Sequence, residues 1–267
     1  MQTPSEELVT GDQTSDLLWQ EALMQGYVER AKLLYVEHVA LEARDEAILA
    51  YLRELSNLQS YLRAKKWRQA LELLESLEAS LPLDMDVKRE LAELAQSSSF
   101  LDRNQPEEAL EILEKLKSPL LLAEILTQKG TAQILLAEND AAEASFDEAL
   151  DYDPKHYRAL TNRANLWLEQ SQIPQAIQGY EAALNVKDNF ANALHNLAIA
   201  YRKQGQINKS VQLLRKAQRA MRQQDSEEAK GRLVQNGHKR LGLKPQYFVY
   251  SLLAILLLLW LRSRGII

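Results

Sequence analysis

The sequence predicts an all-α fold of repeated helical hairpins, followed by a single transmembrane helix. The 267 residues include only nine Gly and seven Pro, while Leu, Ala, Glu and Gln, which lose little rotamer freedom in a helix, recur throughout. Similar residues return at a period of 34 in the second half of the chain, and such a period indicates a repeat architecture. One long apolar run lies at 247–261. Together these three observations favour a helical-repeat domain joined to a membrane span.

Composition and charge narrow the classes of function. The chain has no Cys, so disulfide and thiolate chemistry are absent. Residues 1–200 hold 18 Lys and Arg against 34 Asp and Glu, whereas residues 201–267 hold 14 against 3. A basic segment beside an apolar run is typical of a membrane-proximal region, because anionic lipid attracts Lys and Arg. We expect no nucleic-acid partner, since no aromatic or recognition-helix pattern accompanies these cations.

Residues 1–50 predict N-terminal helices. The opening segment MQTPSEELVTGDQTS is acidic and polar, unlike a secretory signal, so we expect the domain in the cytoplasm. Ala31 and Tyr35 in ERAKLLYVEHV have the spacing of a hairpin's second helix. Two arrangements fit: a degenerate capping hairpin, or one long helix from Asp16 into the next hairpin.

Residues 51–118 predict two degenerate hairpins. Their second helices are indicated by WRQALELLESL and QPEEALEILEKL, which carry a weaker form of the pattern found downstream. The apolar positions are Leu58, Tyr61, Ala70, Leu74 and Leu77 in the first hairpin and Ala109, Leu113 and Leu116 in the second. The step from Ala70 to Ala109 is longer than the step from Ala109 to Ala142, so one connection must be irregular. The polar stretch 96–99 is the candidate for it.

Residues 119–222 predict three full repeats at the period of 34. The coinciding positions are Leu126, Leu160 and Leu194; Gly130, Ala164 and Ala198; Ala142, Ala176 and Ser210; Phe146, Tyr180 and Leu214; and Ala149, Ala183 and Ala217. Small residues in such columns lie where the two helices of a hairpin press together, and large ones fill the space toward the next hairpin.

These repeats resemble the tetratricopeptide-repeat (TPR) family. The segments AEASFDEA, AIQGYEAA and SVQLLRKA match the family's A-x3-[FYL]-x2-A pattern. Pro154 falls at the family's terminal proline, and Gly205 at its turn glycine. The resemblance implies a solenoid with a right-handed superhelix, in which the first helix of each hairpin lines a concave groove.

Polar residues on those first helices are the candidate partner-binding residues, since side-chain amides can hydrogen-bond the backbone of a peptide. They are Gln128, Thr131, Asn162, Asn165, His195 and Asn196. Asn is also common there in the family, where it satisfies local groups, so a purely structural role stays open. Family members that hold chaperone C-termini resemble one another in carrying Lys and Arg at positions filled here by Thr127, Asn192 and Asn196, which disfavours that role.

We expect no enzyme. The four His residues are widely scattered, and no zinc-helix spacing, phosphate-binding glycine loop or nucleophile elbow occurs. The pair Glu107–Glu108 sits at a predicted helix start, where acidic residues stabilise the helix dipole. The sequence therefore predicts no catalytic residue, no cofactor, no metal and no small-molecule substrate.

Residues 223–245 predict a closing helix and a basic juxtamembrane linker. Asp225 stands three residues before Glu228, the spacing of a capping box, and Gly242 provides a stop. Leu233 and Val234 would then cover the open end of the last repeat.

Residues 246–263 predict a transmembrane helix, with 264–267 as a short tail. Tyr247–Leu261 would extend about 22 Å as a helix, short of a hydrocarbon core of roughly 30 Å. Tyr247, Tyr250 and Trp260 can sit at the interfaces, Arg262 and Arg264 can snorkel, and Leu256 lies near the middle. More positive charge precedes the run than follows it, which places the repeats on the cytoplasmic side. The expected class is a tail-anchored, single-pass protein.

Two functions fit these features. The first is a membrane-tethered adaptor or scaffold that binds a protein or peptide through its repeats. The alternative is a subunit or assembly factor of a membrane complex, with the anchor contributing contacts. The first is favoured because Leu252–Leu259 contains no Gly, no small-residue face and no ionisable residue of the kind that joins spans. In a third arrangement, the apolar run would pack into a soluble partner.

Overall fold

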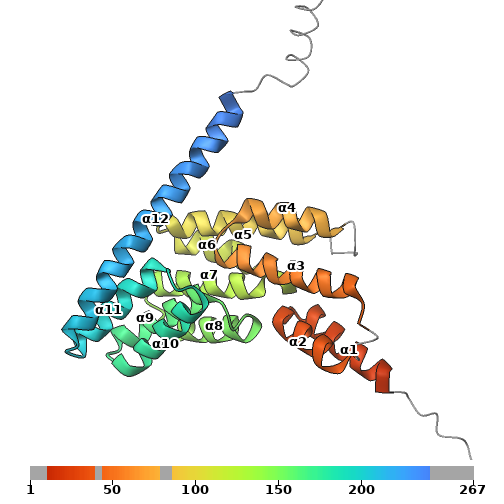
Figure 1. The fold of residues 1–267 in the computed structure, drawn as a ribbon, viewed down its shortest axis with the longest axis horizontal. Coiled ribbons are helices and arrows are strands. Elements are labelled where there is room, and N and C mark those ends of the chain that lie inside the picture. The colour runs from red at the N-terminus through yellow and green to blue at the C-terminus, as the bar shows by residue number, and fades with distance from the viewer. Residues whose placement is uncertain (1–10, 40–43, 79–85, 241–267) are drawn as a thin grey trace, which may run out of the picture. The chain divides into compact units, whose positions relative to one another are not determined.

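A computed structural model describes residues 11–39, 44–78 and 86–240, and every regular element in these ranges is helical. Consecutive helices pair as antiparallel hairpins (Figure 1). The helices are α1 (Gly11–Met24), α2 (Val28–His38), α3 (Glu46–Arg63), α4 (Trp67–Glu78), α5 (Asp86–Asp102), α6 (Pro106–Leu113), the 3-10 turn η2 (Pro119–Leu121), α7 (Leu122–Leu135), α8 (Asn139–Tyr152), α9 (Tyr157–Glu169), α10 (Ile173–Val186), α11 (Ala191–Lys203) and α12 (Ile207–Arg240). The chain divides into two units, Met1–Ala217 and Gln218–Ile267, and the first contains α1 to α11 and the beginning of α12.

One turn design closes each of the six hairpins in the described ranges. The two helices are joined by three residues, and the middle residue has a positive φ. The next backbone N–H donates to the carbonyl five residues earlier, which is the long bond of a Schellman motif. The middle residues are Gly26, Lys65, Asn104, Ala137, Ser171 and Gly205, with φ from 52° to 91°. The turn therefore keeps its geometry along the chain while its residue type varies.

The N-terminal residues form a hairpin, α1–α2, so the alternative of one long helix from Asp16 is wrong. The break at Gly26 has two causes. Its φ of +91° suits glycine, and a Cβ there would collide with the carbonyl of Pro119 in η2. The α1–α2 turn thus lies directly against the loop that follows the third hairpin.

The predicted irregular connection at 96–99 is also wrong, because these residues lie inside α5. Ser97 precedes Ala109 by the same number of residues by which Gly130 precedes Ala142. Ser97 therefore fills the small-residue position of its own hairpin. Its side chain is fully buried. The extra residues of the longer step therefore fall between α4 and α5, where 79–85 lie outside the described residues.

Close helix packing explains the small-residue column. A Cβ on Gly130 would lie 2.6 Å from the Phe146 ring, and one on Gly179 would lie 2.8 Å from the Ala164 Cβ. Phe146 and Tyr180, the predicted large residues, are both fully buried. The repeating columns thus correspond to real contacts between the helices of α7–α8 and α9–α10.

The predicted helix start at Asp225 is not present, because α12 continues from Ile207 to Arg240 without a break. Residues 218–226 contain no Gly or Pro and many good helix formers, so nothing in them stops the preceding helix. The side chains of Leu233 and Val234 are not among those that the structure describes.

No helix in the described ranges is both long and apolar enough to span a membrane. The predicted span at 246–263, including Tyr247, Tyr250, Leu256, Trp260 and Arg262, lies outside those ranges, as does Arg264.

Candidate interaction surface on the first helices

A ladder of polar pairs joins the first helices of four successive hairpins, α5, α7, α9 and α11. Each rung links two side chains that are 31 residues apart, and the rungs follow the repeat period. The rungs are Ser97–Gln128, Thr131–Asn162 and Asn165–Asn196. Five of the six predicted partner-binding residues belong to this ladder. The repeat thus brings them together on one row across the first helices.

The first rung is buried. The Ser97 hydroxyl donates to Gln128 Oε1 at 2.6 Å, and Gln128 Nε2 donates to Glu124 Oε1 at 3.0 Å. Gln128 is only 1% exposed. Its amide is committed to contacts inside the protein, so Gln128 cannot serve as the partner-contacting residue that the sequence suggested.

The second and third rungs are half-buried. Asn162 Nδ2 donates to Thr131 Oγ1 at 3.2 Å, and Asn196 Nδ2 donates to Asn165 Oδ1 at 2.8 Å. The Tyr180 hydroxyl donates to the same Asn165 oxygen at 2.7 Å, and burial raises the pKa of Tyr180, which keeps that donor protonated. The amides therefore bridge neighbouring helices rather than local backbone groups.

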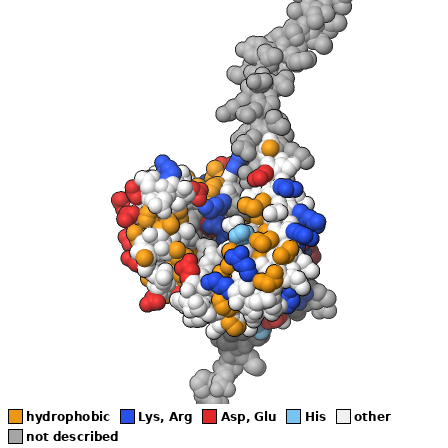
Figure 2. Space-filling view, turned by 90° about the vertical axis from the view of Figure 1, so that its left-hand side faces the viewer, with side chains coloured by type: hydrophobic (Ala, Val, Ile, Leu, Met, Phe, Trp, Pro, Cys, Tyr) orange, Lys and Arg blue, Asp and Glu red, His pale blue; other side chains and the backbone are white. Residues whose placement is uncertain are grey.

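Each of these amides has two N–H donors and an oxygen with two lone pairs. Because Asn162 and Asn196 each use one donor in the ladder, they keep capacity for a further ligand at the exposed edge of the side chain. His195, next to Asn196 on α11, is exposed. Figure 2 shows acidic side chains gathered on one side of a hollow and Lys, Arg and His side chains on the other. The row of first helices thus offers polar groups suited to peptide recognition.

A buried ionic cluster lies beneath the first rung. Glu124 on α7 receives Arg158 Nη2 at 3.0 Å and the ring nitrogen Nε2 of His156 at 3.0 Å. His156 Nδ1 accepts from the Ala159 N–H, which assigns the proton on the neutral ring to Nε2. Burial alone would raise the pKa of Glu124, but the charge of Arg158 and the His156 hydrogen bond outweigh it, so this pKa lies below its ordinary value.

A second buried pair connects distant parts of the chain. Arg63, at the end of α3, contacts Asp153 at 2.8 Å and donates to the Lys155 carbonyl at 3.2 Å. Lys155 Nζ in turn lies 2.8 Å from Glu29 Oε2 on α2. These bonds tie the two N-terminal hairpins to the α8–α9 turn. Sequence reasoning missed them, because a Lys or Arg in the last turn of a helix is ordinary and its partner here lies several hairpins away.

The ionic cluster has the character of a structural support. Its acidic groups are paired with Arg or His and almost fully buried. Among the residues that the structure describes, no group of three or more His, Asp or Glu side chains could hold a metal ion. The cluster orders the hairpins that carry the ladder.

Residues 127–193 and 191–224 match two family models, both described as tetratricopeptide repeat. This part of the chain therefore contains TPR repeats. No curated protein matches the chain.

Several solved structures are similar to this chain. One is a crystal structure of MamA, with 18% identity, 63% of this chain and 96% of that chain covered, and a TM-score of 0.42. Another, MamA 41-end from Desulfovibrio magneticus RS-1, has 27% identity, coverages of 49% and 75%, and a TM-score of 0.41. A third, YrrB, is described as a TPR protein with an unusual peptide-binding site; it has 16% identity, coverages of 62% and 84%, and a TM-score of 0.39.

Proposed function

We propose that this protein is a membrane-tethered TPR adaptor that binds a protein or peptide partner through its first helices. The observation that carries the proposal is the half-buried pair of rungs, Thr131–Asn162 and Asn165–Asn196, within the residues that match the TPR models. TPR repeats generally act as binding scaffolds, so the proposal assigns no reaction to the chain.

The partner-facing groups are the amides of Asn162, Asn165 and Asn196, with Thr131 and the exposed ring of His195 beside them. An extended peptide presents alternating backbone donors and acceptors, and an amide can meet both kinds. Because the rungs recur with the repeat period, successive amides offer a regular series of contacts along the helices. This geometry suits a main-chain ligand better than a compact small molecule.

The tether is proposed from the sequence. Residues 246–263 combine an apolar run with interfacial Tyr and Trp and with flanking Arg, features that suit a bilayer span. The stronger positive charge ahead of the run favours the cytoplasmic side for the repeats, with anionic lipid near the basic residues.

The groove is tested by site-specific photocrosslinking in the full chain. A benzoylphenylalanine at His195 should capture the partner, whereas the same probe at Gln178, an exposed position on α10, should not. Asn162→Ala with Asn196→Ala should reduce capture from His195 without changing the helical circular dichroism. Equal capture from both probe positions would argue against a specific first-helix surface.

The tether is tested by alkaline washing of membranes. Leu256→Arg should release the protein from the pellet, because a charge at the centre of a span costs about 3 kcal/mol or more, while Leu256→Phe should leave it there. Retention of the Arg variant would contradict the anchor.

A version ending at Lys244 separates the two functions that the sequence left open. An adaptor keeps its photocrosslinked partner after this truncation, since binding depends on the repeats. A membrane-complex subunit whose anchor contributes contacts loses the partner at matched expression.

A further inference from the structure

The last hairpin differs from the others in charge. No Asp or Glu occurs from Asn189 to Gln224, yet this stretch holds seven Lys and Arg residues. All seven are exposed. They are Arg202, Lys203, Lys209, Arg215, Lys216, Arg219 and Arg222. In water these cations attract an acidic partner to the hairpin regardless of its detailed shape.

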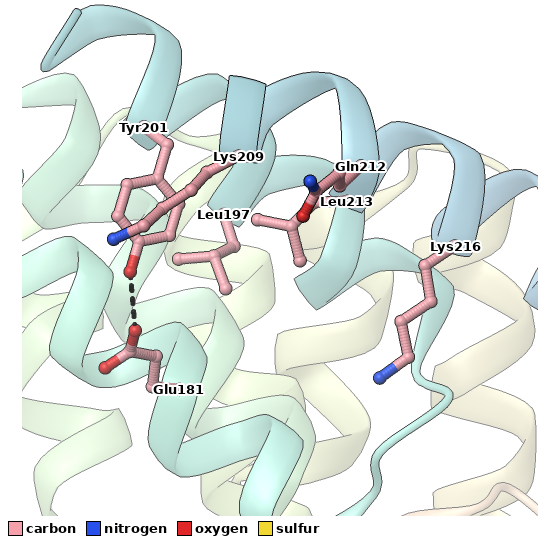
Figure 3. A pocket seen from close by; sticks show the side chains of 7 residues that line it. All are labelled: Glu181, Leu197, Tyr201, Lys209, Gln212, Leu213 and Lys216. Atoms are coloured by element: carbon pink, nitrogen blue, oxygen red, sulfur yellow. Dashed lines mark hydrogen bonds between the residues drawn. The ribbon is translucent and has the colours of Figure 1, made fainter. Parts of the chain in front are cut away.

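A pocket of about 330 Å³ lies within this basic region, between α10, α11 and the start of α12. Figure 3 shows Leu197 and Leu213 between the Tyr201–Lys209 pair on one side and Lys216 on the other. Leu197 is buried and Leu213 is partly buried, so the floor is apolar. Two cations thus stand on either side of an apolar floor.

Two of the remaining polar groups of the pocket, Tyr201 and Glu181, are bonded to each other. The Tyr201 hydroxyl donates to Glu181 Oε1 at 2.7 Å, which engages the carboxylate that lines the pocket. Lys209 Nζ lies 4.8 Å from the centre of the Tyr201 ring, within the range of a cation–π contact. Tyr201 therefore holds both Glu181 and Lys209 at one end of the pocket.

We propose that this pocket binds an acidic segment of a partner protein, with one apolar side chain on Leu197 and Leu213 and flanking carboxylates at Lys209 and Lys216. The side-chain amide of Gln212 is placed to meet the segment's backbone. The volume is near the lower end of the range for ligand pockets, roughly 300–1,000 Å³, which suits a side chain with its adjoining backbone.

A protein segment fits these observations better than a membrane surface. Lipid headgroups attract cations that project from a convex surface, whereas here the two lysines flank a hollow with an apolar floor. This surface is distinct from the amide ladder, so it adds a second contact to a partner, or a second partner, beyond the proposed groove.

Binding can be measured by fluorescence anisotropy with the full chain in detergent. The probe is a fluorescein-labelled decapeptide of Asp and Glu with one central Leu. Reversing both pocket lysines, Lys209→Glu with Lys216→Glu, should weaken binding by about tenfold or more, because two ion pairs are replaced by repulsion. Replacing the probe's Leu by Ser should also weaken binding, since the apolar floor then has no occupant.

A matched control reverses two cations of the same hairpin that do not line the pocket. Lys203→Glu with Arg215→Glu has the same net charge as the pocket variant and should change binding by less than about twofold. Equal weakening in both double variants would overturn the proposal, because it would show attraction to net charge only. An unchanged affinity for the Ser probe would overturn the role of the floor.

One further outcome would show that the ligand of the pocket is a lipid headgroup and not a peptide. If the acidic probe fails to bind while dihexanoyl phosphatidylserine binds saturably and is lost in the pocket variant, the site recognises a headgroup and the proposal for a peptide is wrong. None of these measurements uses Asn162 or Asn196. A negative result for the pocket would therefore not contradict the proposed first-helix surface. A negative result for that surface would likewise not contradict the pocket.

Discussion

Two regions of the repeat domain use charge in opposite ways. Beneath the first rung, Glu124 is 1% exposed and is bonded to Arg158 and His156. In the last hairpin, Lys209 and Lys216 are exposed beside a pocket and face water. A buried, paired charge holds neighbouring hairpins in place, whereas an exposed, unbalanced set is available to a partner. The same helical-hairpin repeat thus supports a structural role where its charges are buried and, in our proposal, a binding role where they are exposed.

The largest expected effect comes from breaking the buried cluster. Glu124→Gln should destabilise the fold by about 3 kcal/mol, because it leaves the nearly buried Arg158 without its counter-charge. Urea unfolding followed by circular dichroism measures the loss. The control is Glu181→Gln, an exposed carboxylate in the basic region, which should cost less than about 1 kcal/mol. Equal losses would remove the distinction between the two regions.

The pH dependence of stability in the wild type and in Glu124→Gln tests whether the buried carboxylate acts in its ionised form. Because the pKa of Glu124 is lowered in the folded state, its stabilisation is fully present above its unfolded value, near 4.5, and is lost as the pH falls through the folded pKa. The stability difference between the wild type and Glu124→Gln should therefore shrink as the pH falls below the unfolded value and through the folded pKa of Glu124. A difference that stays unchanged far into the acid range, to about pH 2, would contradict this ionised role.

A smaller effect is expected from Gly130→Ala, about 1–3 kcal/mol of destabilisation, because the new Cβ would press on the buried ring of Phe146. Thermal melting measures it. The last hairpin has Ala198 and Leu214 at the corresponding positions. Adding Phe146→Leu should therefore recover part of the loss, and no recovery would show that Gly130 is needed for another reason.

The smallest effect on stability is expected in the basic hairpin. Lys203→Glu with Arg215→Glu should change the free energy of unfolding by less than about 0.5 kcal/mol, since both side chains are exposed. Urea unfolding in the same buffer provides the comparison with Glu124→Gln. A loss of more than about 1 kcal/mol would mean that these cations also support the fold.

The local parts of this architecture could be predicted, because the period acts on neighbouring residues. The Gly130–Phe146 contact follows from two columns that recur with the repeat period. Contacts between distant residues could not be predicted, since a single sequence gives no signal that Arg63 meets Asp153. Two local errors have a common cause. The serines at 97–99 and the capping-box spacing at Asp225 have turn and cap propensities, which the surrounding helices override.

The ladder, too, could be predicted only in part. The period places Asn162 and Asn196 on one row, but their partners Thr131 and Asn165 become visible only when neighbouring first helices pack at an offset of 31 residues. The burial of Gln128 depends on Ser97 and Glu124, which lie outside its own column. Burial thus removes Gln128 from the expected binding surface, whereas the equivalent residues Asn162 and Asn196 stay accessible.

The shared turn connects the two helices of each hairpin in the same way. From Gly26 to Gly205, the loop inside each hairpin has the same length, and its middle residue has a left-handed backbone conformation whether it is Gly, Lys, Asn, Ala or Ser. A loop of this kind places few demands on the surface chemistry of the helices that it joins. The basic hairpin could therefore be transplanted into another helical-repeat scaffold together with α10, because Glu181 on α10 completes the proposed pocket between Lys209 and Lys216.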